Sequence, residues 1–171
     1  PNFKLPAVDG KNYELKDFRG KTIVLEWINY GCPYVQKHYN SGNMPRLQAK
    51  FTEKGIVWLS INSSAPGKQG NYSIKKWKEM NQKKNNQATA VLLDESGKVG
   101  RKYGAKTTPH MYIVDKKGIL RYNGAIDDKP TTQLEDVKTA HNYVAAALDA
   151  LDNKKPVPEK STRPYGCSVK Y

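Results

Sequence analysis

Cysteine is scarce in this sequence of 171 residues, which contains only Cys32 and Cys167. Val35 stands three residues after Cys32, where a local dithiol partner would be placed. The spacing therefore excludes a Cys-x-x-Cys pair, and the low count excludes a disulfide-rich scaffold. Two distant cysteines permit one disulfide, a free reactive thiol, or both in turn, and they do not settle the redox compartment.

Long apolar runs and acidic residues are also missing. No run approaches the roughly 20 apolar residues that a membrane helix needs, so we expect no membrane span. Sixteen acidic residues stand against 29 Lys and Arg, which gives a net charge of +13 and favours acidic partners. The lysines are dispersed and no nucleic-acid-binding motif is present, so a solvated basic surface is the better interpretation than nucleic-acid binding.

The length fits a single domain with a full core. The chain begins at Pro1 rather than at a methionine. A removed signal peptide is one explanation and an omitted upstream segment is another. An extracytoplasmic location, periplasmic or secreted, is slightly favoured over a cytoplasmic one.

The stretch around Cys32 carries the strongest chemical signal. Residues 22–28 are mainly β-branched and aromatic, which predicts a buried strand. Pro33 suits the first turn of a helix, which we expect over residues 33–53. Cys32 would then lie at a helix N-terminus, where free N–H groups and the helix dipole favour an anion such as a thiolate. We interpret Cys32 as a nucleophile, although free cysteines are more often small buried hydrophobes.

Alternating strands and helices are predicted for the rest of the chain up to residue 152. The expected strands cover residues 11–15, 56–62, 90–94, 110–115 and 119–122. The expected helices cover residues 71–84, 98–103 and 131–152. The strand, helix and strand around Cys32 predict a βαβ unit with parallel strands.

Several side chains are assigned from these patterns. Pro45 is expected to bend or break the helix over residues 33–53. Ile74 and Trp77 are expected to face inward from their helix. His141 falls on an apolar stripe of the last helix, so we interpret it as a core histidine. Residues 153–171 hold three prolines and no periodicity, which predicts an extended arm that carries Cys167.

The motif Cys32-Pro33-Tyr34-Val35, the later Thr108-Pro109 and the order of elements together resemble the thioredoxin superfamily. Within it, the chain is similar to the redoxin branch, the alkyl hydroperoxide reductase/thiol-specific antioxidant group with its peroxiredoxin-like relatives. The tail over residues 164–169 is similar to one peroxiredoxin-like subgroup. The resemblance implies a thioredoxin-like three-layer α/β/α sandwich with a mixed central sheet over residues 1–152, followed by the arm 153–171.

The resemblance also implies thiol-based redox chemistry. Cys32 would attack a peroxide O–O bond or a disulfide sulfur, without a cofactor or metal, and an external thiol such as a thioredoxin would act as reductant. Asn29 stands where peroxiredoxins have a substrate-holding threonine, so we expect it to take that role in altered form. Thr108 and Pro109 match the cis-proline segment that contacts substrate. The alternative is a non-catalytic interaction domain with an inert Cys32 and an acidic partner; a monomer and a dimer both remain open.

Glu26 and Cys167 complete the expected site. Glu26 interrupts an apolar strand and matches a buried proton acceptor of thioredoxin; the alternative is a glutamate paired with a lysine at the sheet edge. Cys167 is expected to resolve Cys32, within one chain or between two. The arm from residue 153 to residue 167 spans up to about 50 Å, which is enough to cross the domain. The alternative is an exposed, unpaired thiol.

The histidines give weaker signals. His38 lies six residues after Cys32 and should point away from the thiol on a helix. His110 could approach Cys32. Those two side chains alone would make a poor copper site, so no metal is expected.

Overall fold

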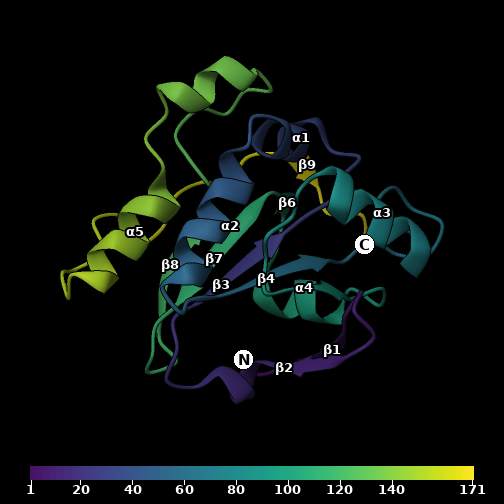
Figure 1. The fold of residues 1–171 in the computed structure, drawn as a ribbon, viewed down its shortest axis with the longest axis horizontal. Helices are drawn as coiled ribbons and strands as arrows, with labels where there is room; N and C mark the ends of the chain where they lie inside the picture. The colour runs from purple at the N-terminus through teal and green to yellow at the C-terminus, as the bar shows by residue number, and fades with distance from the viewer.

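In the computed structural model, which describes all of residues 1–171, a five-stranded sheet forms the centre of the molecule (Figure 1). Its strands, in spatial order, are β5 (Ala90–Leu93), β4 (Val57–Asn62), β3 (Ile23–Trp27), β7 (His110–Val114) and β8 (Leu120–Gly124). The first three are parallel to one another, β7 is antiparallel to β3, and β8 is antiparallel to β7. The predicted mixed sheet and its βαβ unit are confirmed.

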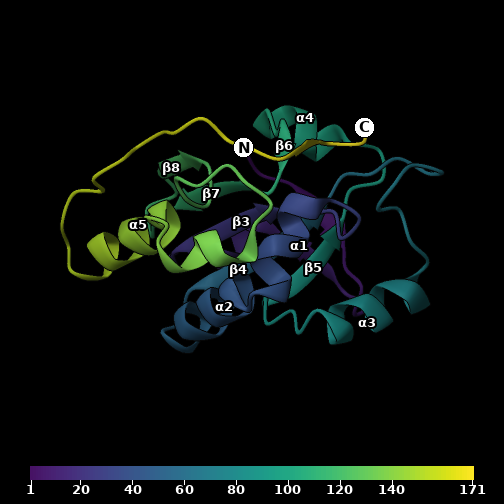
Figure 2. The same cartoon turned by 90° about the horizontal axis from the view of Figure 1, so that it is seen from above.

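Helices cover both faces of the sheet, but unequally (Figure 2). One face carries α1 (Pro33–Asn40), α2 (Asn43–Glu53), α3 (Ile74–Lys83) and α5 (Tyr143–Asp152). The other carries α4 (Lys98–Tyr103) and an N-terminal hairpin of β1 (Lys4–Pro6) and β2 (Asn12–Glu14), with the 3-10 turn η1 (Leu15–Phe18). This arrangement confirms the three-layer α/β/α architecture. None of the helices is both long and apolar enough to cross a bilayer.

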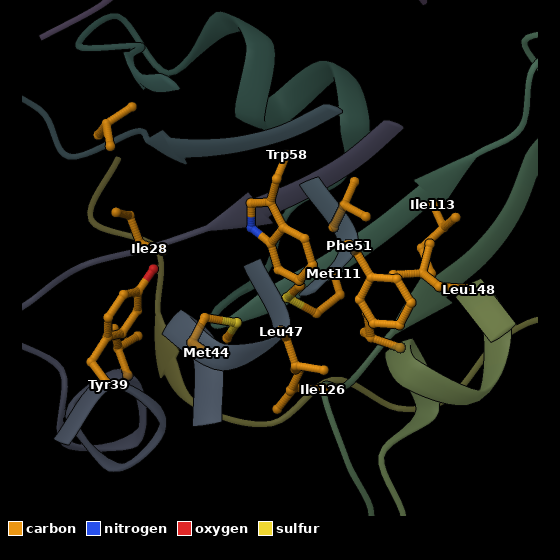
Figure 3. Packing of buried hydrophobic residues seen from close by; sticks show 14 of the residues in the cluster. Ile28, Tyr39, Met44, Leu47, Phe51, Trp58, Met111, Ile113, Ile126 and Leu148 are labelled. Atoms are coloured by element: carbon orange, nitrogen blue, oxygen red, sulfur yellow. The ribbon is translucent and has the colours of Figure 1, made fainter. Parts of the chain in front are cut away.

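Two hydrophobic cores lie on opposite sides of the sheet because successive strand residues point to opposite faces. On β3, Val24 packs under the four-helix face, whereas Leu25 and Trp27 pack with the N-terminal hairpin and α4. The larger core joins α2, the sheet and α5 through Phe51, Trp58, Met111 and Leu148 (Figure 3).

The chain after α5 has no helix and returns across the molecule (yellow in Figure 2). It contains one short strand, β9 (Cys167–Ser168), which pairs antiparallel with β6 (Thr107–Thr108). The C-terminal residues therefore lie against the segment that precedes β7. We call residues 153–171 the arm.

The helix predicted over residues 33–53 is two helices, and the expectation of a break at Pro45 is wrong. The break lies at Gly42, whose φ of +77° suits glycine and separates α1 from α2. Pro45 lies in the first turn of α2, where a missing N–H leaves no helical hydrogen bond unmade.

The helix predicted over residues 131–152 is also shorter than expected. A 3-10 turn, η2 (Leu134–Lys138), is followed by α5, whose N-terminus is capped where the Asn142 side chain accepts a hydrogen bond from Ala145 N at 2.8 Å. His141 precedes this cap and is exposed, so its assignment to the core is wrong. The remaining predicted helices and strands are present, with ends that differ by a few residues.

Helix α3 distinguishes a core anchor from a surface residue. Trp77 is 1% exposed and packs against Tyr30 and Tyr72, with ring centroids 5.5 and 5.1 Å away. Ile74, one turn earlier, is 46% exposed, so the expectation that it faces inward is wrong. The helix is therefore held to the core through Trp77.

This difference gives a stability prediction. Trp77→Ala should lower the free energy of unfolding by about 3–5 kcal/mol, because it leaves a cavity among aromatic rings. Ile74→Ala on the same helix should change it by less than about 1 kcal/mol. Urea unfolding followed by circular dichroism measures both, and equal losses would contradict the assignment of Trp77 as the anchor.

Candidate active site around Cys32 and Cys167

Cys32 lies beside Thr108 and Pro109 because β3 and β7 run antiparallel. Trp27 at the end of β3 pairs with His110 at the start of β7, so the residues after β3 meet those before β7. The Thr108–Pro109 peptide bond is cis, as the resemblance implies. The sulfur of Cys32 lies 3.3 Å from the carbonyl oxygen of Thr108.

The predicted position of Cys32 at a helix N-terminus is confirmed. Cys32 is the N-cap residue of α1, and its carbonyl oxygen accepts a hydrogen bond from Gln36 N at 2.9 Å. Pro33 occupies the first turn. The sulfur of Cys32 lies at the positive end of the helix dipole. The Cys32 side chain makes no capping hydrogen bond to the first turn of α1. This sulfur is completely buried.

Cys167 is the partner that the structure brings to Cys32. Both cysteines are free, and their sulfur atoms lie 2.7 Å apart within one chain. The pairing of β9 with β6 sets Cys167 opposite Thr108, which explains the approach. Burial and the contact with Cys32 raise the pKa of the Cys167 thiol to about 11, so this thiol is protonated at neutral pH.

The backbone of the arm fits closely over Thr108. Gly166 has φ of +145°, and a Cβ at this position would overlap the carbonyl oxygen of Thr108. Beyond β9, Val169 N donates to Lys106 O at 3.1 Å, and the Tyr171 hydroxyl donates to Ala105 O at 2.7 Å. These contacts fix the end of the arm on both sides of Cys167.

Asn29 holds the turn that leads to Cys32. Its side-chain oxygen accepts a hydrogen bond from Gly31 N at 2.9 Å, and its amide donates to Gln69 Oε1 at 3.1 Å. Gln69 in turn donates to Gly31 O at 3.3 Å. Gln69 was not identified from the sequence, because it lies in a loop without any periodic pattern. The substrate contact expected of Asn29 stays a prediction.

Glu26 is buried at the centre of the sheet. Its carboxylate accepts four hydrogen bonds, from Tyr39 at 2.6 Å, Trp58 at 2.8 Å, Ser60 at 2.9 Å and Gln48 at 3.0 Å. Burial raises the pKa of this carboxyl group, although the four hydrogen bonds oppose the shift. No lysine pairs with it and β3 is not an edge strand, so the lysine-pair alternative is wrong. Its role as proton acceptor stays a prediction.

The histidines have partners other than Cys32. His110 accepts a hydrogen bond from Lys106 N at 3.1 Å, and its other ring nitrogen lies 2.7 Å from Asn123 Oδ1. His38 contacts Tyr165 and Asn43. No group of three or more His, Cys, Asp or Glu side chains is placed to hold a metal ion.

The sequence of residues 1–123 matches the model of the AhpC/TSA family. The chain belongs to this family. The resemblance to the redoxin branch is therefore confirmed.

Relatives of this AhpC/TSA protein include thiol-disulfide enzymes. The thiol-disulfide oxidoreductase ResA of Bacillus thuringiensis subsp. konkukian is 27% identical over 118 residues, which are 69% of this chain and 62% of the relative. The thiol:disulfide interchange protein DsbE of Pseudomonas aeruginosa is 29% identical over 133 residues, 75% of this chain and 67% of the relative. The chain thus spans less than two thirds of the length of the ResA relatives.

A solved structure resembles this AhpC/TSA protein over its full length. An uncharacterized conserved protein from Geobacillus kaustophilus has a TM-score of 0.85 and 30% identity, covering 100% of this chain and 89% of that chain. The similarity therefore includes the arm as well as the sheet and helices.

The close fit at Gly166 leads to a prediction for this AhpC/TSA protein. Gly166→Ala should lift β9 from β6, because the new methyl group overlaps the Thr108 carbonyl. Iodoacetamide should then alkylate the otherwise buried Cys32 at least about tenfold faster, which corresponds to about 1.4 kcal/mol of lost docking free energy. Mass spectrometry of the reduced protein measures the rate.

Gly118→Ala is the matched control. Gly118 also has a positive φ, +80°, but a Cβ there meets no atom within 4 Å. Both variants place an alanine at a positive φ, and only Gly166→Ala also brings a methyl group against Thr108. An unchanged Cys32 rate in Gly166→Ala, or the same increase in both variants, would contradict the assigned role of Gly166.

Proposed function

We propose that the protein is a thiol-disulfide oxidoreductase in which Cys32 is the nucleophile and Cys167 the resolving thiol. The observation that carries this proposal is the 2.7 Å separation of the two sulfur atoms at the N-terminus of α1. The ResA and DsbE relatives, which are named as thiol-disulfide enzymes, support it.

The proposed reaction has two exchange steps. The Cys32 thiolate attacks one sulfur of a substrate disulfide, forms a mixed disulfide and releases the first substrate thiolate. Cys167 then loses its proton and attacks the Cys32 sulfur, which releases the second substrate thiolate and leaves a Cys32–Cys167 disulfide. The substrate gains two electrons and the protein thiols lose them. An external thiol reductant, such as a thioredoxin, would reduce the protein again.

The two cysteines have different environments that suit these steps. Cys32, the proposed attacking sulfur, lies at the N-terminus of α1, which is the positive end of the helix dipole. Cys167 keeps its proton at neutral pH, because its pKa is raised to about 11. In the proposed cycle, residues 1–152 form the redox domain and the arm supplies the second thiol. Thr108 and Pro109 would contact the substrate once β9 leaves β6.

A peroxide is the second candidate substrate. The hydroxyl oxygen of Thr108 is the one buried side-chain oxygen or nitrogen without a hydrogen-bond partner, and its residue contacts Cys32. Such a hydroxyl can bond to a peroxide oxygen. Cys32 would then become a sulfenic acid as water or an alcohol leaves, and Cys167 would convert it to the disulfide with release of water.

The extracytoplasmic location stays a proposal. In an oxidising compartment the proposed Cys32–Cys167 disulfide would persist until an external thiol reduces it. The competing hypothesis, an interaction domain that binds an acidic partner, needs neither cysteine to react.

Oxidation of cysteine variants tests the proposal. With oxidised glutathione, the wild type should form the Cys32–Cys167 disulfide, Cys167→Ser should stop at a Cys32–glutathione mixed disulfide, and Cys32→Ser should do neither. Acid-quenched samples are analysed by mass spectrometry without reductant. Hydrogen peroxide in a parallel series shows whether a sulfenic acid replaces the mixed disulfide. An unreactive wild type would favour the interaction domain, whereas full reactivity of Cys32→Ser, through Cys167, would remove Cys32 as the nucleophile.

The pH dependence tests Glu26. If Glu26 accepts the Cys167 proton, its carboxylate form is needed, so wild-type disulfide closure should rise as pH passes through the raised pKa of Glu26. Glu26→Gln should lose this rise and keep only the increase at higher pH that comes from deprotonation of Cys167 itself. Closure rates from pH 5 to pH 10 measure the profile.

Stability supplies a second readout for the same variant. A raised carboxyl pKa gives stability that is present below the unfolded pKa and is lost as pH rises through the folded pKa. Glu26→Gln should therefore gain stability relative to the wild type as pH rises. Glu53→Gln, at the exposed end of α2, makes the same charge change and should show neither effect. An unchanged closure profile in Glu26→Gln would make Glu26 structural.

A further inference from the structure

The arm contacts α1 at a second place besides Cys167. Tyr165 packs edge-on against Tyr34, with ring centroids 5.7 Å apart, and Lys37 Nζ lies 5.4 Å from the centre of the Tyr165 ring. Tyr34 and Lys37 belong to the helix whose N-cap is Cys32. Cys167 and Tyr165 of the arm therefore both contact this one short helix or its N-cap.

The Tyr165 hydroxyl enters a buried polar cluster beneath the arm. Its oxygen lies 2.6 Å from Asp127 Oδ1 and 2.9 Å from His38 Nε2. The side chains of His38 and Asp127 are 0% and 1% exposed. Lys37 is also buried, and its ammonium group donates to Lys129 O at 2.7 Å. Hydrogen bonds in such a site are expensive to leave unmade.

The direction of these hydrogen bonds follows from their chemistry. The Asn43 amide nitrogen lies 2.9 Å from His38 Nδ1 and can only donate, so Nδ1 accepts. The ring proton is then on Nε2, which donates to the Tyr165 oxygen, and the Tyr165 hydroxyl donates to Asp127. Burial, with the charge of Lys37, lowers the pKa of His38 to about 3 and keeps the ring neutral. Asn43, His38, Tyr165 and Asp127 thus form one directed chain.

We propose that Tyr165 is a positioning residue, whose hydroxyl sets the arm on α1 so that Cys167 reaches Cys32. The proposal rests on the proposed function of the two cysteines. Only Gly166 separates Tyr165 from Cys167, and its backbone lies against Thr108. Because the chain between the two contacts is one residue long, a shift of Tyr165 moves the Cys167 sulfur relative to Cys32.

Disulfide closure with oxidised glutathione tests the proposal in the full-length protein. The first step, capture of glutathione on Cys32, needs no arm contact. The second step, attack of Cys167 on the mixed disulfide, needs the arm in place. Tyr165→Phe should slow the second step about tenfold, since a buried hydrogen bond to a carboxylate is lost. The first step should keep its rate or become faster. Quenched-flow mass spectrometry separates the two rates.

Tyr143→Phe is the matched control, because the Tyr143 hydroxyl makes no hydrogen bond and its residue lies on α5. It should leave both rates unchanged. Asp127→Asn keeps an acceptor for the Tyr165 hydroxyl without the charge, so closure should slow less, about threefold. Circular dichroism shows whether each variant is folded. If Tyr165→Phe does not fold, the closure rate of Asp127→Asn tests the positioning role instead.

The outcomes separate this proposal from the proposed function. A slower second step relative to the first supports a positioning role, since a general loss of stability would not change their ratio in this way. Wild-type closure rates in Tyr165→Phe, or in Asp127→Asn if only that variant folds, overturn the proposal and leave the function intact. A wild type that captures no glutathione overturns the function itself.

Discussion

The antiparallel pairing of β3 with β7 is the constraint on which the candidate site depends. It sets Trp27 opposite His110 and so brings the turn before α1 next to the cis peptide before β7. A shift of one residue in this register would exchange the two faces of β3, moving Glu26 and Trp27 into each other's core. Cys32, the proposed nucleophile, is therefore positioned by the central sheet, in which every residue of β3 is buried.

Three polar or amphipathic residues of helix α1 are buried: Lys37, His38 and Tyr39. Tyr39 contacts Glu26 on the sheet, while its neighbours Lys37 and His38 face the cluster beneath the arm. Each of these groups has hydrogen-bond partners, which is the condition under which a polar group is tolerated in a protein interior. The helix consequently joins the sheet to the arm, and its position depends on its contacts with both.

This enclosure explains which features a sequence can predict. Cys32 was placed correctly because its signals are local, an apolar strand before it and a proline after it. The burial of Lys37 and His38 depends on Tyr165 and Asp127, which are about ninety to 130 residues further along the chain. Helical periodicity reports only on residues within one helix, so it cannot predict burial by such distant residues. The prediction for His141 was wrong because the local pattern was misleading: His141 fits an apolar stripe, but α5 begins only after it. Local patterns fixed the elements, whereas long-range contacts decided which polar residues are buried.

The arm also determines how the candidate site can be reached. Cys32 has no exposed surface while β9 is paired with β6, and the edge of β6 that Cys167 occupies is the edge at Thr108. In the proposed cycle a disulfide in a polypeptide must therefore displace the arm before Cys32 attacks, and the arm must return before Cys167 closes the bond. Substrate entry needs the edge of β6 at Thr108 to be free, whereas disulfide closure needs β9 to be paired with it. The two events therefore cannot occur at the same time. Two-residue pairing suits this exchange, because β9 makes few strand hydrogen bonds and can be released at a smaller free-energy cost than a strand of the central sheet.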